Sequence, residues 1–309
     1  MKIMKIPITQ SREWQKLQND LNETCFLEEN EHFHYLAIKK STPVGNYLYL
    51  PYGPVLEEKN DFKAALKSLE ELAEKENCIF VRIEPQIPDL KLPTNAKKSK
   101  DLSPKETWML DLTGNEDELK SKLPSRLLRY YKGHENKGIK IETSKNPSDI
   151  HYLLDLQKAL ADKKGISTFS EHYLETELKQ DFATLYLVKY TDEETKKTDI
   201  VAAGLVFDYE DTRYNLQGAQ NDTGRSLHAT GILTIQLIMD AYKDGKKLFD
   251  FWGIAPEGAP KDHPWAGFTN FKKTFAGYEV DYAGTYDIVL KPSKYKLYKL
   301  LRSARRHIG

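Results

Sequence analysis

Apolar residues along this chain recur with two spacings, one typical of helices and the other of strands. In residues 61–77 apolar side chains recur at intervals of three or four, which predicts a helix with one buried face. Residues 78–85 form a short apolar run that Pro85 ends, which predicts a strand. Helical and strand patterns alternate in this way along the chain, and the alternation favours an α/β or α+β fold.

The same patterns predict further elements. Helices are expected at 116–132, 148–163, 227–243, 267–275 and 293–308. Residues 45–55 are expected to form a strand that runs into a Pro/Gly turn, and further strands are expected at 107–113, 138–144, 184–190, 200–209, 213–220, 247–254 and 278–290. Pro124 is expected to split or kink the first of these helices, and the segment that holds Gly224 is expected to form a loop. Residues 86–106, which are rich in proline and lysine, are expected to form a loop at a domain boundary.

Length and composition exclude several classes of protein. A chain of 309 residues exceeds the usual size of one domain, so two domains are expected. No apolar run reaches the roughly 18–20 residues of a transmembrane helix, and the N-terminus lacks the apolar run of a secretory signal. Cys25 and Cys78 are too few for a disulfide framework or a four-cysteine zinc site. We therefore expect a protein of a reducing compartment, the cytoplasm.

Several short motifs occur together in one order. The segment 249–290 contains FDFWGI, GFTNFKKTF and GTYD, and earlier segments contain LPYGPV, VRIEP and WMLDL. In this order the motifs resemble the Fem family (FemA, FemB and FemX), aminoacyltransferases that build the side bridges of peptidoglycan. The resemblance covers nearly the whole chain. It indicates the compact form without a coiled-coil arm, since the chain has no heptad run.

The resemblance implies a fold and a domain organisation. The fold class is α/β (α+β), with two GNAT-like (acyl-CoA N-acyltransferase-type) domains that contain mixed sheets. The first domain is expected at 1–106, with 284–309 packing back on it, and the second at 107–283.

The resemblance also implies an enzyme, an aminoacyl-tRNA-dependent aminoacyltransferase (an acyltransferase) of cell-wall biogenesis. It would transfer Gly, Ala or Ser from aminoacyl-tRNA to the stem peptide of a lipid-linked or UDP-linked peptidoglycan precursor, forming the interpeptide bridge. Aminoacyl-tRNA and the precursor are the expected partners, and no cofactor is expected. The expected location is the cytoplasm, with peripheral contact at the inner face of the cell membrane.

The implied reaction sets chemical requirements. An amine attacks an ester carbonyl, which needs a neutral amine, a positive charge near the tetrahedral oxyanion and a proton for the departing ribose hydroxyl. Direct transfer needs no Ser or Cys nucleophile, and the chain has no Gly-x-Ser-x-Gly motif.

Lys272 is the residue that the resemblance places nearest to this chemistry. It follows Phe271, as the family lysine near the reacting carbonyl follows an aromatic residue, and Phe271 is assigned to substrate binding. The alternative is that Lys272 and Lys273 are solvated lysines on a short helix.

Two further residues match family positions in strands. Glu84, at the end of a strand, matches an acidic position that holds or deprotonates the acceptor amine. Its alternative is a structural carboxylate paired with Arg82 or another cation. Tyr214 matches a tyrosine that faces the precursor, and its alternative is an ordinary core tyrosine.

The chain departs from the family where compact members grip a nucleotide diphosphate. Gln18 and Phe169 stand where those members have a lysine and an arginine. Either Lys16 and Arg225 substitute as substrate-binding cations, or the acceptor is the lipid-linked precursor, held differently.

Charge is balanced in total but unevenly distributed. The chain has 46 Lys and Arg against 46 Asp and Glu, which argues weakly against a dedicated DNA-binding protein. However, basic residues concentrate in 120–145 and in 291–309. These stretches are either solvated helix faces, or contacts with tRNA phosphates or an anionic membrane surface. The residues assigned to tRNA binding are Arg126, Arg129 and Lys132, and the membrane contact is assigned to 291–309.

Two alternative functions stay open. One is a coenzyme A-dependent N-acyltransferase, although the turn at 222–230 lacks the Arg/Gln-x-x-Gly-x-Gly/Ala pattern that binds pyrophosphate. The other is a non-catalytic protein that binds tRNA or a cell-wall precursor. No metal site is expected, because His32 and His34 lack further ligands nearby in the sequence.

Overall fold

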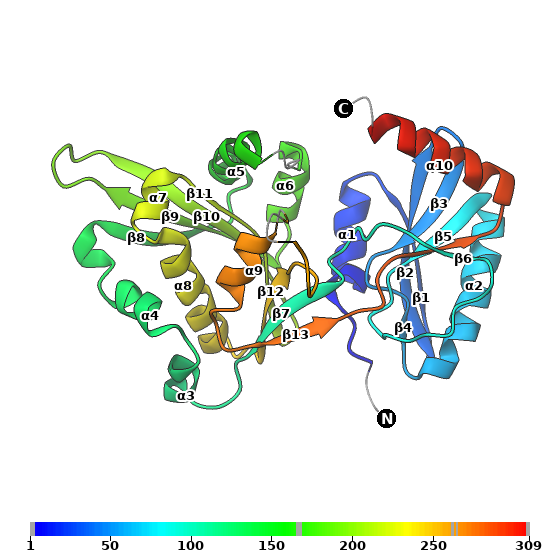
Figure 1. Ribbon diagram of the computed structural model, residues 1–309, viewed down its shortest axis with the longest axis horizontal. Coiled ribbons are helices and arrows are strands. Elements are labelled where there is room, and N and C mark those ends of the chain that lie inside the picture. Colours follow the sequence, from blue (N-terminus) through cyan, green and yellow to red (C-terminus); the bar gives the residue numbers. More distant parts are fainter. Residues whose placement is uncertain (1–3, 165–168, 261–262, 264, 307–309) are drawn as a thin grey trace. The chain divides into compact units, whose positions relative to one another are not determined.

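The chain forms two compact units, each containing one mixed sheet (Figure 1). A computed structural model describes residues 4–164, 169–260, 263 and 265–306. The first unit comprises residues 1–105 and 281–309, and the second comprises residues 106–280. The domain boundaries expected from the sequence fall after residue 106 and after residue 283, beside those of the two units.

The sheet of the first unit has the strand order β1-β2-β3-β5-β14-β6, and β4 pairs with β2. β3 and β5 are parallel, and α2 connects them, whereas the other pairs are antiparallel. The strands are β1 (Thr24–Glu29), β2 (Phe33–Thr42), β3 (Gly45–Leu50), β4 (Val55–Leu56), β5 (Cys78–Ile83), β6 (Ala96–Lys98) and β14 (Tyr286–Val289). The α-helices are α1 (Arg12–Asp20), α2 (Phe62–Lys75) and α10 (Pro292–Arg306).

The sheet of the second unit has the order β13-β7-β12-β11-β10-β9-β8. β11 and β12 are parallel, and α7 and α8 connect them. The strands are β7 (Glu106–Asp111), β8 (Ile139–Ser144), β9 (Ala183–Thr191), β10 (Thr198–Tyr209), β11 (Thr212–Gln220), β12 (Leu248–Gly253) and β13 (Tyr278–Asp281). The helices are α3 (Glu116–Ser121), α4 (Ser125–Lys132), α5 (Ile150–Lys164), α6 (Glu171–Leu178), α7 (Asp222–Ser226), α8 (Ala229–Lys243) and α9 (Ala266–Lys272).

The core of the second unit is organised around α8. Most α8 side chains are buried, which is typical of a helix covered on several sides. One of its neighbours is α4, whose Leu127 approaches Gly231 so closely that a Cβ on Gly231 would lie 2.6 Å from Leu127 Cδ2. Glycine at this position therefore permits the close packing of α4 on α8.

The local signals for helices and strands were mostly confirmed, including the split at proline. Pro124 separates α3 from α4 and occupies the N-cap position of α4, where its missing N–H costs no hydrogen bond. The crossover helix between β3 and β5 also lies where the three-and-four spacing predicted it.

Three predictions were wrong. The strand expected at 278–290 is two strands in different sheets, β13 and β14, separated by Gly284 at a φ of 79°. The loop expected at 86–106 contains β6, which pairs with β14, far along the chain. The loop expected around Gly224 is the short helix α7, because the Asn221 side chain caps it by accepting from Gly224 N at 2.8 Å.

A buried polar cluster lies where α5, α6 and β11 meet. Glu177 on α6 is buried and accepts a hydrogen bond from Gln217 Nε2 at 3.3 Å and another from the Tyr173 hydroxyl. Gln157 of α5 donates to Gln217 Oε1 at 3.0 Å. Within the described residues no Lys or Arg pairs with Glu177, so burial raises the pKa of its carboxyl to about 8.

Glu177 should make the stability of the protein depend on pH. Its folded-state pKa lies above the value of about 4.3 in an unfolded chain, so the carboxyl stabilises the fold at low pH. This contribution is lost as the pH rises through about 8. We expect Glu177→Gln, which keeps the hydrogen-bonding shape, to unfold at a higher temperature than the wild type at pH 9. The difference should shrink toward pH 5, as measured by thermal denaturation. Glu175→Gln on the same helix is the matched control, and an equal gain there would contradict the assignment.

Candidate functional site

One end of β12 in the second unit has an irregular backbone. Pairing with β7 shifts between Asp250 and Gly253, and Trp252 adopts a φ of 65°, a left-handed conformation that is costly for a bulky residue. This irregularity lets Trp252 N donate to Asp250 Oδ1 at 2.7 Å, and pairing with β7 resumes at Gly253, opposite Thr107.

Lys272, at the C-terminal end of α9, reaches this irregular segment. Its ammonium donates to the Gly253 carbonyl at 2.6 Å, and its side chain is half-buried. Burial lowers the pKa of Lys272 to about 8, against the opposing effect of the Asp250 carboxylate. Lys272 forms no ion pair with any carboxylate of the described residues, so it offers a cation whose charge is only partly compensated.

Asp250 lies in the core beside this lysine. Its carboxylate accepts hydrogen bonds from the Thr107 hydroxyl of β7 and from Trp252 N. Burial raises the pKa of Asp250 to about 6, while these hydrogen bonds and the Lys272 charge act in the other direction. At neutral pH Asp250 is therefore largely ionised and favours the charged form of Lys272. Sequence reasoning missed Asp250, although a carboxylate inside the apolar run FDFWGI is a usable signal.

Two aromatic residues assigned to substrate binding belong to the same unit as Lys272. Tyr214 on β11 is in register with Asp250 on β12, is buried, and packs edge-on against Trp252 at 6.3 Å between ring centroids. Phe271 is half-buried and packs edge-on against Phe275 at 5.5 Å. Tyr214 is therefore a direct neighbour of the Asp250 backbone, whereas Phe271 contributes to the core.

The neighbouring lysine has a different environment. Lys273 is exposed, forms an ion pair with Glu279 at 2.9 Å, and lies over the Trp108 ring. The description of a solvated lysine thus fits Lys273 but not Lys272, which is drawn inward to the Gly253 carbonyl.

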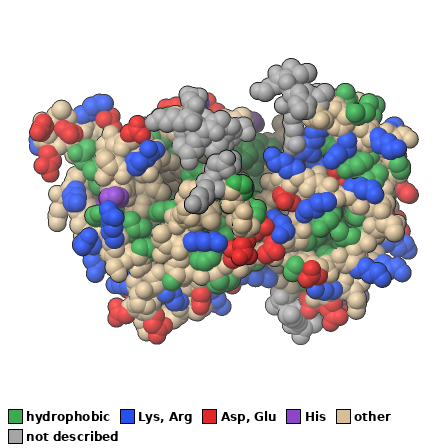
Figure 2. All heavy atoms as spheres, in the orientation of Figure 1, with side chains coloured by type: hydrophobic (Ala, Val, Ile, Leu, Met, Phe, Trp, Pro, Cys, Tyr) green, Lys and Arg blue, Asp and Glu red, His purple; other side chains and the backbone are tan. Residues whose placement is uncertain are grey.

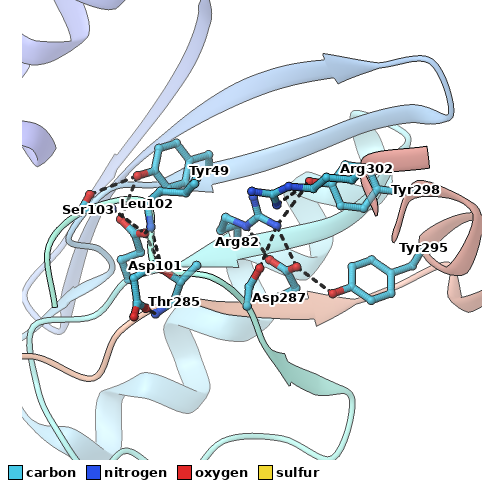
Figure 3. Close-up of polar contacts among 12 residues, drawn as sticks. Tyr49, Arg82, Asp101, Leu102, Ser103, Thr285, Asp287, Tyr295, Tyr298 and Arg302 are labelled. Carbon is cyan, nitrogen blue, oxygen red and sulfur yellow. Dashed lines mark hydrogen bonds and ion pairs between the residues drawn. The ribbon is translucent and has the colours of Figure 1, made fainter. Parts of the chain in front are cut away.

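Glu84, in the first unit, is a buried carboxylate that joins several segments (Figure 3). The Tyr49 hydroxyl donates to it at 2.8 Å, the Thr285 hydroxyl at 2.6 Å, and the backbone N–H groups of Leu102 and Ser103 at 3.2 Å each. These four donors hold both carboxylate oxygens. The arrangement favours a structural role, and a role in handling the acceptor amine stays a prediction.

The alternative in which Glu84 pairs with Arg82 does not hold, because Arg82 has another partner. Arg82 lies directly opposite Asp287 in the register of β5 with β14, and its guanidinium binds that carboxylate. Its Nε lies 2.7 Å from Oδ1 and its Nη2 lies 2.9 Å from Oδ2 (Figure 3). This bidentate pair is buried and occupies the interior of the first unit.

The residues considered for gripping a diphosphate do not form one cluster. Lys16 is exposed on α1 in the first unit, and Gln18 on the same helix is buried. Arg225 is exposed on α7 in the second unit and lies 3.7 Å from Asp222. Phe169 is exposed and stacks on Tyr173 at 5.0 Å. Their roles in substrate binding stay predictions.

Basic residues of α4 converge on one aromatic ring. Arg126 Nε donates to the Tyr130 hydroxyl at 3.0 Å, and Arg129 also hydrogen-bonds it. The charged groups of Arg126, Arg129 and Lys137 lie 5.5, 5.9 and 5.6 Å from the Tyr130 ring centroid. The ring itself stacks on His228, with centroids 4.4 Å apart and planes within 7°. We call Arg126, Arg129, Tyr130, Lys137 and His228 the α4 cationic cluster.

The three cations of this cluster are exposed and lack counter-charges among the described residues. Among the described residues no carboxylate pairs with its three cations, and together the two arginines lower the pKa of Tyr130. Lys132, at the end of α4, is also exposed. Figure 2 shows Lys and Arg side chains spread over the surface of the second unit. Unpaired cations gathered in this way are typical of a surface that binds a polyanion.

The turn at 222–230 differs from an open anion-binding turn. It forms α7 and then His228, the N-cap of α8, at a φ of 57°. One of the first amides of α8, Thr230 N, donates to Gln220 Oε1 at 3.2 Å. Because a side chain of the protein already occupies this donor, the helix terminus is less available to a pyrophosphate.

The two histidines near the N-terminus have different neighbours. His32 lies 3.3 Å from Asp61 and 3.5 Å from Glu31, and a ring nitrogen of buried His34 hydrogen-bonds the Gln10 carbonyl at 2.5 Å. No group of three or more His, Cys, Asp or Glu that could hold a metal ion occurs in the part of the chain that the structure describes. None of the helices described is both long and apolar enough to cross a bilayer.

Comparison with known proteins places these features in a family context. Residues 175–303 match the FemAB family, whereas no curated protein matches the sequence. The structure of FemX superposes with a TM-score of 0.78 at 17% identity, covering 94% of each chain. A lysylphosphatidylglycerol synthetase C-terminal domain from Agrobacterium fabrum gives 0.58 at 14% identity, covering 94% of this chain and 91% of that one. L-PGS from Bacillus licheniformis gives 0.55 at 15% identity, covering 98% and 99%. The predicted fold class, α/β (α+β) with two GNAT-like domains of mixed sheets, is confirmed.

Proposed function

We propose that this chain, which matches the FemAB family over residues 175–303, is an aminoacyltransferase of peptidoglycan bridge formation. The observation that carries the proposal is Lys272, a half-buried cation on the Gly253 carbonyl beside the Asp250 carboxylate. Its position matches the lysine that the resemblance to the Fem family assigns to the reacting carbonyl. The donor is aminoacyl-tRNA, and the acceptor is an amine on the stem peptide of a precursor.

The proposed reaction joins the amino acid to the acceptor through a tetrahedral intermediate. The neutral acceptor amine attacks the ester carbonyl, forming the C–N bond and an oxyanion. The Lys272 ammonium offsets this charge, as a preorganised donor in a partly buried site does most effectively. The C–O bond to the ribose then breaks, and the proton lost by the amine passes to the ribose oxygen. The donor ester supplies the acyl group, so the proposed reaction requires no cofactor.

Other residues take supporting roles in this proposal. Asp250 favours the charged state of Lys272 and acts as a positioning residue through it. Tyr214, in register with Asp250, is a candidate contact for the precursor. Use of aminoacyl-tRNA would place the reaction in the cytoplasm.

The direct test is a screen of donors and acceptors. Gly-tRNA, Ala-tRNA and Ser-tRNA are incubated with the protein and either lipid-linked or UDP-linked precursor, and the products are weighed by mass spectrometry. We expect the precursor to gain the mass of one amino acid residue with at least one donor. Acylation from acetyl-coenzyme A without tRNA would favour the alternative enzyme. Binding of both substrates without any product would favour a non-catalytic protein.

The α4 cationic cluster should contribute to tRNA binding. We expect Arg126→Gln with Arg129→Gln to weaken binding of a tRNA transcript and to flatten its dependence on salt, because each lost phosphate contact removes about one unit of slope or slightly less. His228→Gly should also weaken binding, although glycine suits the φ of 57° and should not impair folding. Fluorescence anisotropy at several salt concentrations measures both effects.

An exposed lysine outside the cluster provides the control for total charge. Lys197 lies between β9 and β10 and pairs with Asp199 at 2.9 Å. Lys197→Gln should leave RNA affinity nearly unchanged. If it weakened binding as much as the arginine substitutions did, the interaction would depend on net charge alone, and the cluster would have no special role.

A further inference from the structure

The C-terminal helix α10 is attached to the first unit by one face. The Tyr295 hydroxyl donates to Asp287 Oδ2 at 2.8 Å (Figure 3). The Tyr298 ring packs on Phe80 at 5.0 Å between centroids. Arg302 Nη1 donates to the Tyr298 hydroxyl at 3.1 Å. Tyr295, Tyr298 and Arg302 recur at helical spacing, so they form a single inner stripe that orients the helix.

A second apolar stripe on α10 points away from this anchor. Leu297, Leu300 and Leu301 are 48%, 67% and 42% exposed. At about 100° of rotation per residue these leucines share one side of the helix, with exposed Lys296 beside one edge and exposed Lys294 beside the other. A soluble helix normally buries its single apolar stripe. Here one stripe is buried and a second, flanked by lysines, is left uncovered within the described residues.

The charge of the helix has one sign. From 291 to 306 the sequence contains no Asp or Glu, and its basic residues are Lys291, Lys294, Lys296, Lys299, Arg302, Arg305 and Arg306. Among the described residues no carboxylate pairs with Lys294, Lys296 or Lys299. Figure 2 shows Lys and Arg side chains on the surface of the first unit beside hydrophobic ones.

We propose that the outer face of α10 docks on an anionic lipid bilayer. Leucines flanked by lysines match the two zones of a membrane surface, since the leucines enter the acyl boundary while the ammonium groups stay at the headgroups. Contact with RNA would satisfy the lysines but leave the leucines in water. Pairing of two copies through this face would bring two cationic helices together. A bilayer with negative headgroups satisfies both kinds of side chain.

Docking on a bilayer would also determine which acceptor the protein uses, and this part of the inference rests on the proposed function. A precursor carried by a membrane lipid is confined to the surface that α10 would bind. The protein should therefore act on a lipid-linked acceptor rather than on a UDP-linked one.

Co-sedimentation with vesicles tests the docking directly. Vesicles of phosphatidylcholine alone are compared with vesicles that contain about 30% phosphatidylglycerol. We expect binding to the anionic vesicles only, with a loss of at least about ten-fold on triple substitution of Leu297, Leu300 and Leu301 by Ser. Leu102→Ser is the matched control, because Leu102 is 45% exposed elsewhere in the first unit. Substituting Lys294 and Lys296 by Gln should also weaken binding, unlike the same change at Lys63 and Lys67, which lie exposed on α2.

The outcomes separate docking from catalysis. Equal vesicle binding by wild type and the leucine variant, or no binding by wild type, would overturn the proposal. If the leucine variant instead lost tRNA binding or formed fewer dimers, α10 would have a different partner, and the membrane assignment would also fall. Vesicle binding without aminoacyl transfer would leave docking intact and refute the proposed function. Aminoacyl transfer without vesicle binding would refute the docking and leave the proposed function intact.

Discussion

Replacing Lys272 by Ala should reduce the rate of aminoacyl transfer by about 100- to 1,000-fold, the usual cost of losing one group that stabilises an oxyanion. The ammonium is held on the Gly253 carbonyl at 2.6 Å, so it is positioned before the substrate binds. The effect should fall on kcat, because the interaction strengthens as the oxyanion forms. Single-turnover kinetics with aminoacyl-tRNA and precursor would measure it.

The adjacent lysine is the control for this substitution. Lys273→Ala removes an exposed charge that pairs with Glu279, and we expect a change in rate of less than about three-fold, as for a surface ion pair of small energy. Thermal denaturation of both variants verifies that they are folded. Normal turnover in Lys272→Ala would remove Lys272 from the mechanism, and equal losses in both variants would indicate a general charge effect.

Lys272 should also set the alkaline limit of the reaction. Its pKa is about 8, so transfer should decline as the pH rises through that value and the ammonium is lost. Asp250→Asn removes the negative charge that raises the pKa of Lys272, so the alkaline limit should move to lower pH. The acceptor amine also titrates, but Asp250→Asn should shift only the part of the pH profile that reports the ionisation of Lys272. A pH profile of kcat that is identical in wild type and Asp250→Asn would show that the two residues are not coupled.

Asp287→Ala should destabilise the first unit by about 3–5 kcal/mol, the cost of leaving a buried charge unpaired. Asp287 is fully buried and binds Arg82 through both of its oxygens, and it also accepts from Tyr295 (Figure 3). Arg82 remains protonated under all ordinary conditions, so it stays charged in the core of the variant. Chemical denaturation, monitored by circular dichroism, gives the free energy of unfolding.

A surface pair provides the comparison. Lys105 and Asp281 lie 2.5 Å apart but are 30% and 57% exposed, so Asp281→Ala should cost less than about 1 kcal/mol. The double variant Arg82→Met with Asp287→Leu should recover part of the stability lost in Asp287→Ala, since no charge remains buried. Equal costs for Asp287→Ala and Asp281→Ala would contradict the importance assigned to burial.

Sequence patterns located most helices and strands, and they failed where distant segments decide the outcome. The residues 278–290 form one continuous strand pattern, but the chain changes sheets at Gly284. β6 has little apolar character of its own and exists because β14 offers it a free edge. Such pairings depend on strands far apart in the sequence, which local periodicity does not report.

The candidate site shows the same division. The motif match singled out Lys272, but the sequence left open whether Lys272 and Lys273 are both solvated lysines on a short helix. Only the fold turns Lys272 toward the Gly253 carbonyl and leaves Lys273 with Glu279. Likewise Glu84 looked like a candidate acid in the sequence, and the structure surrounds it with four donors.

The sequence by itself determined most of the local elements, the expectation of two domains, and the match of residues 175–303 to the FemAB family. These follow from spacing, proline positions and short motifs, all of which act within a few residues. Tertiary structure alone decided which carboxylate lies beside Lys272, which cations converge on Tyr130, and which stripe of α10 stays exposed. Burial and electrostatic coupling depend on neighbours in space, so the pKa values of Lys272 and Asp250 arise only when β7, β12 and α9 come together.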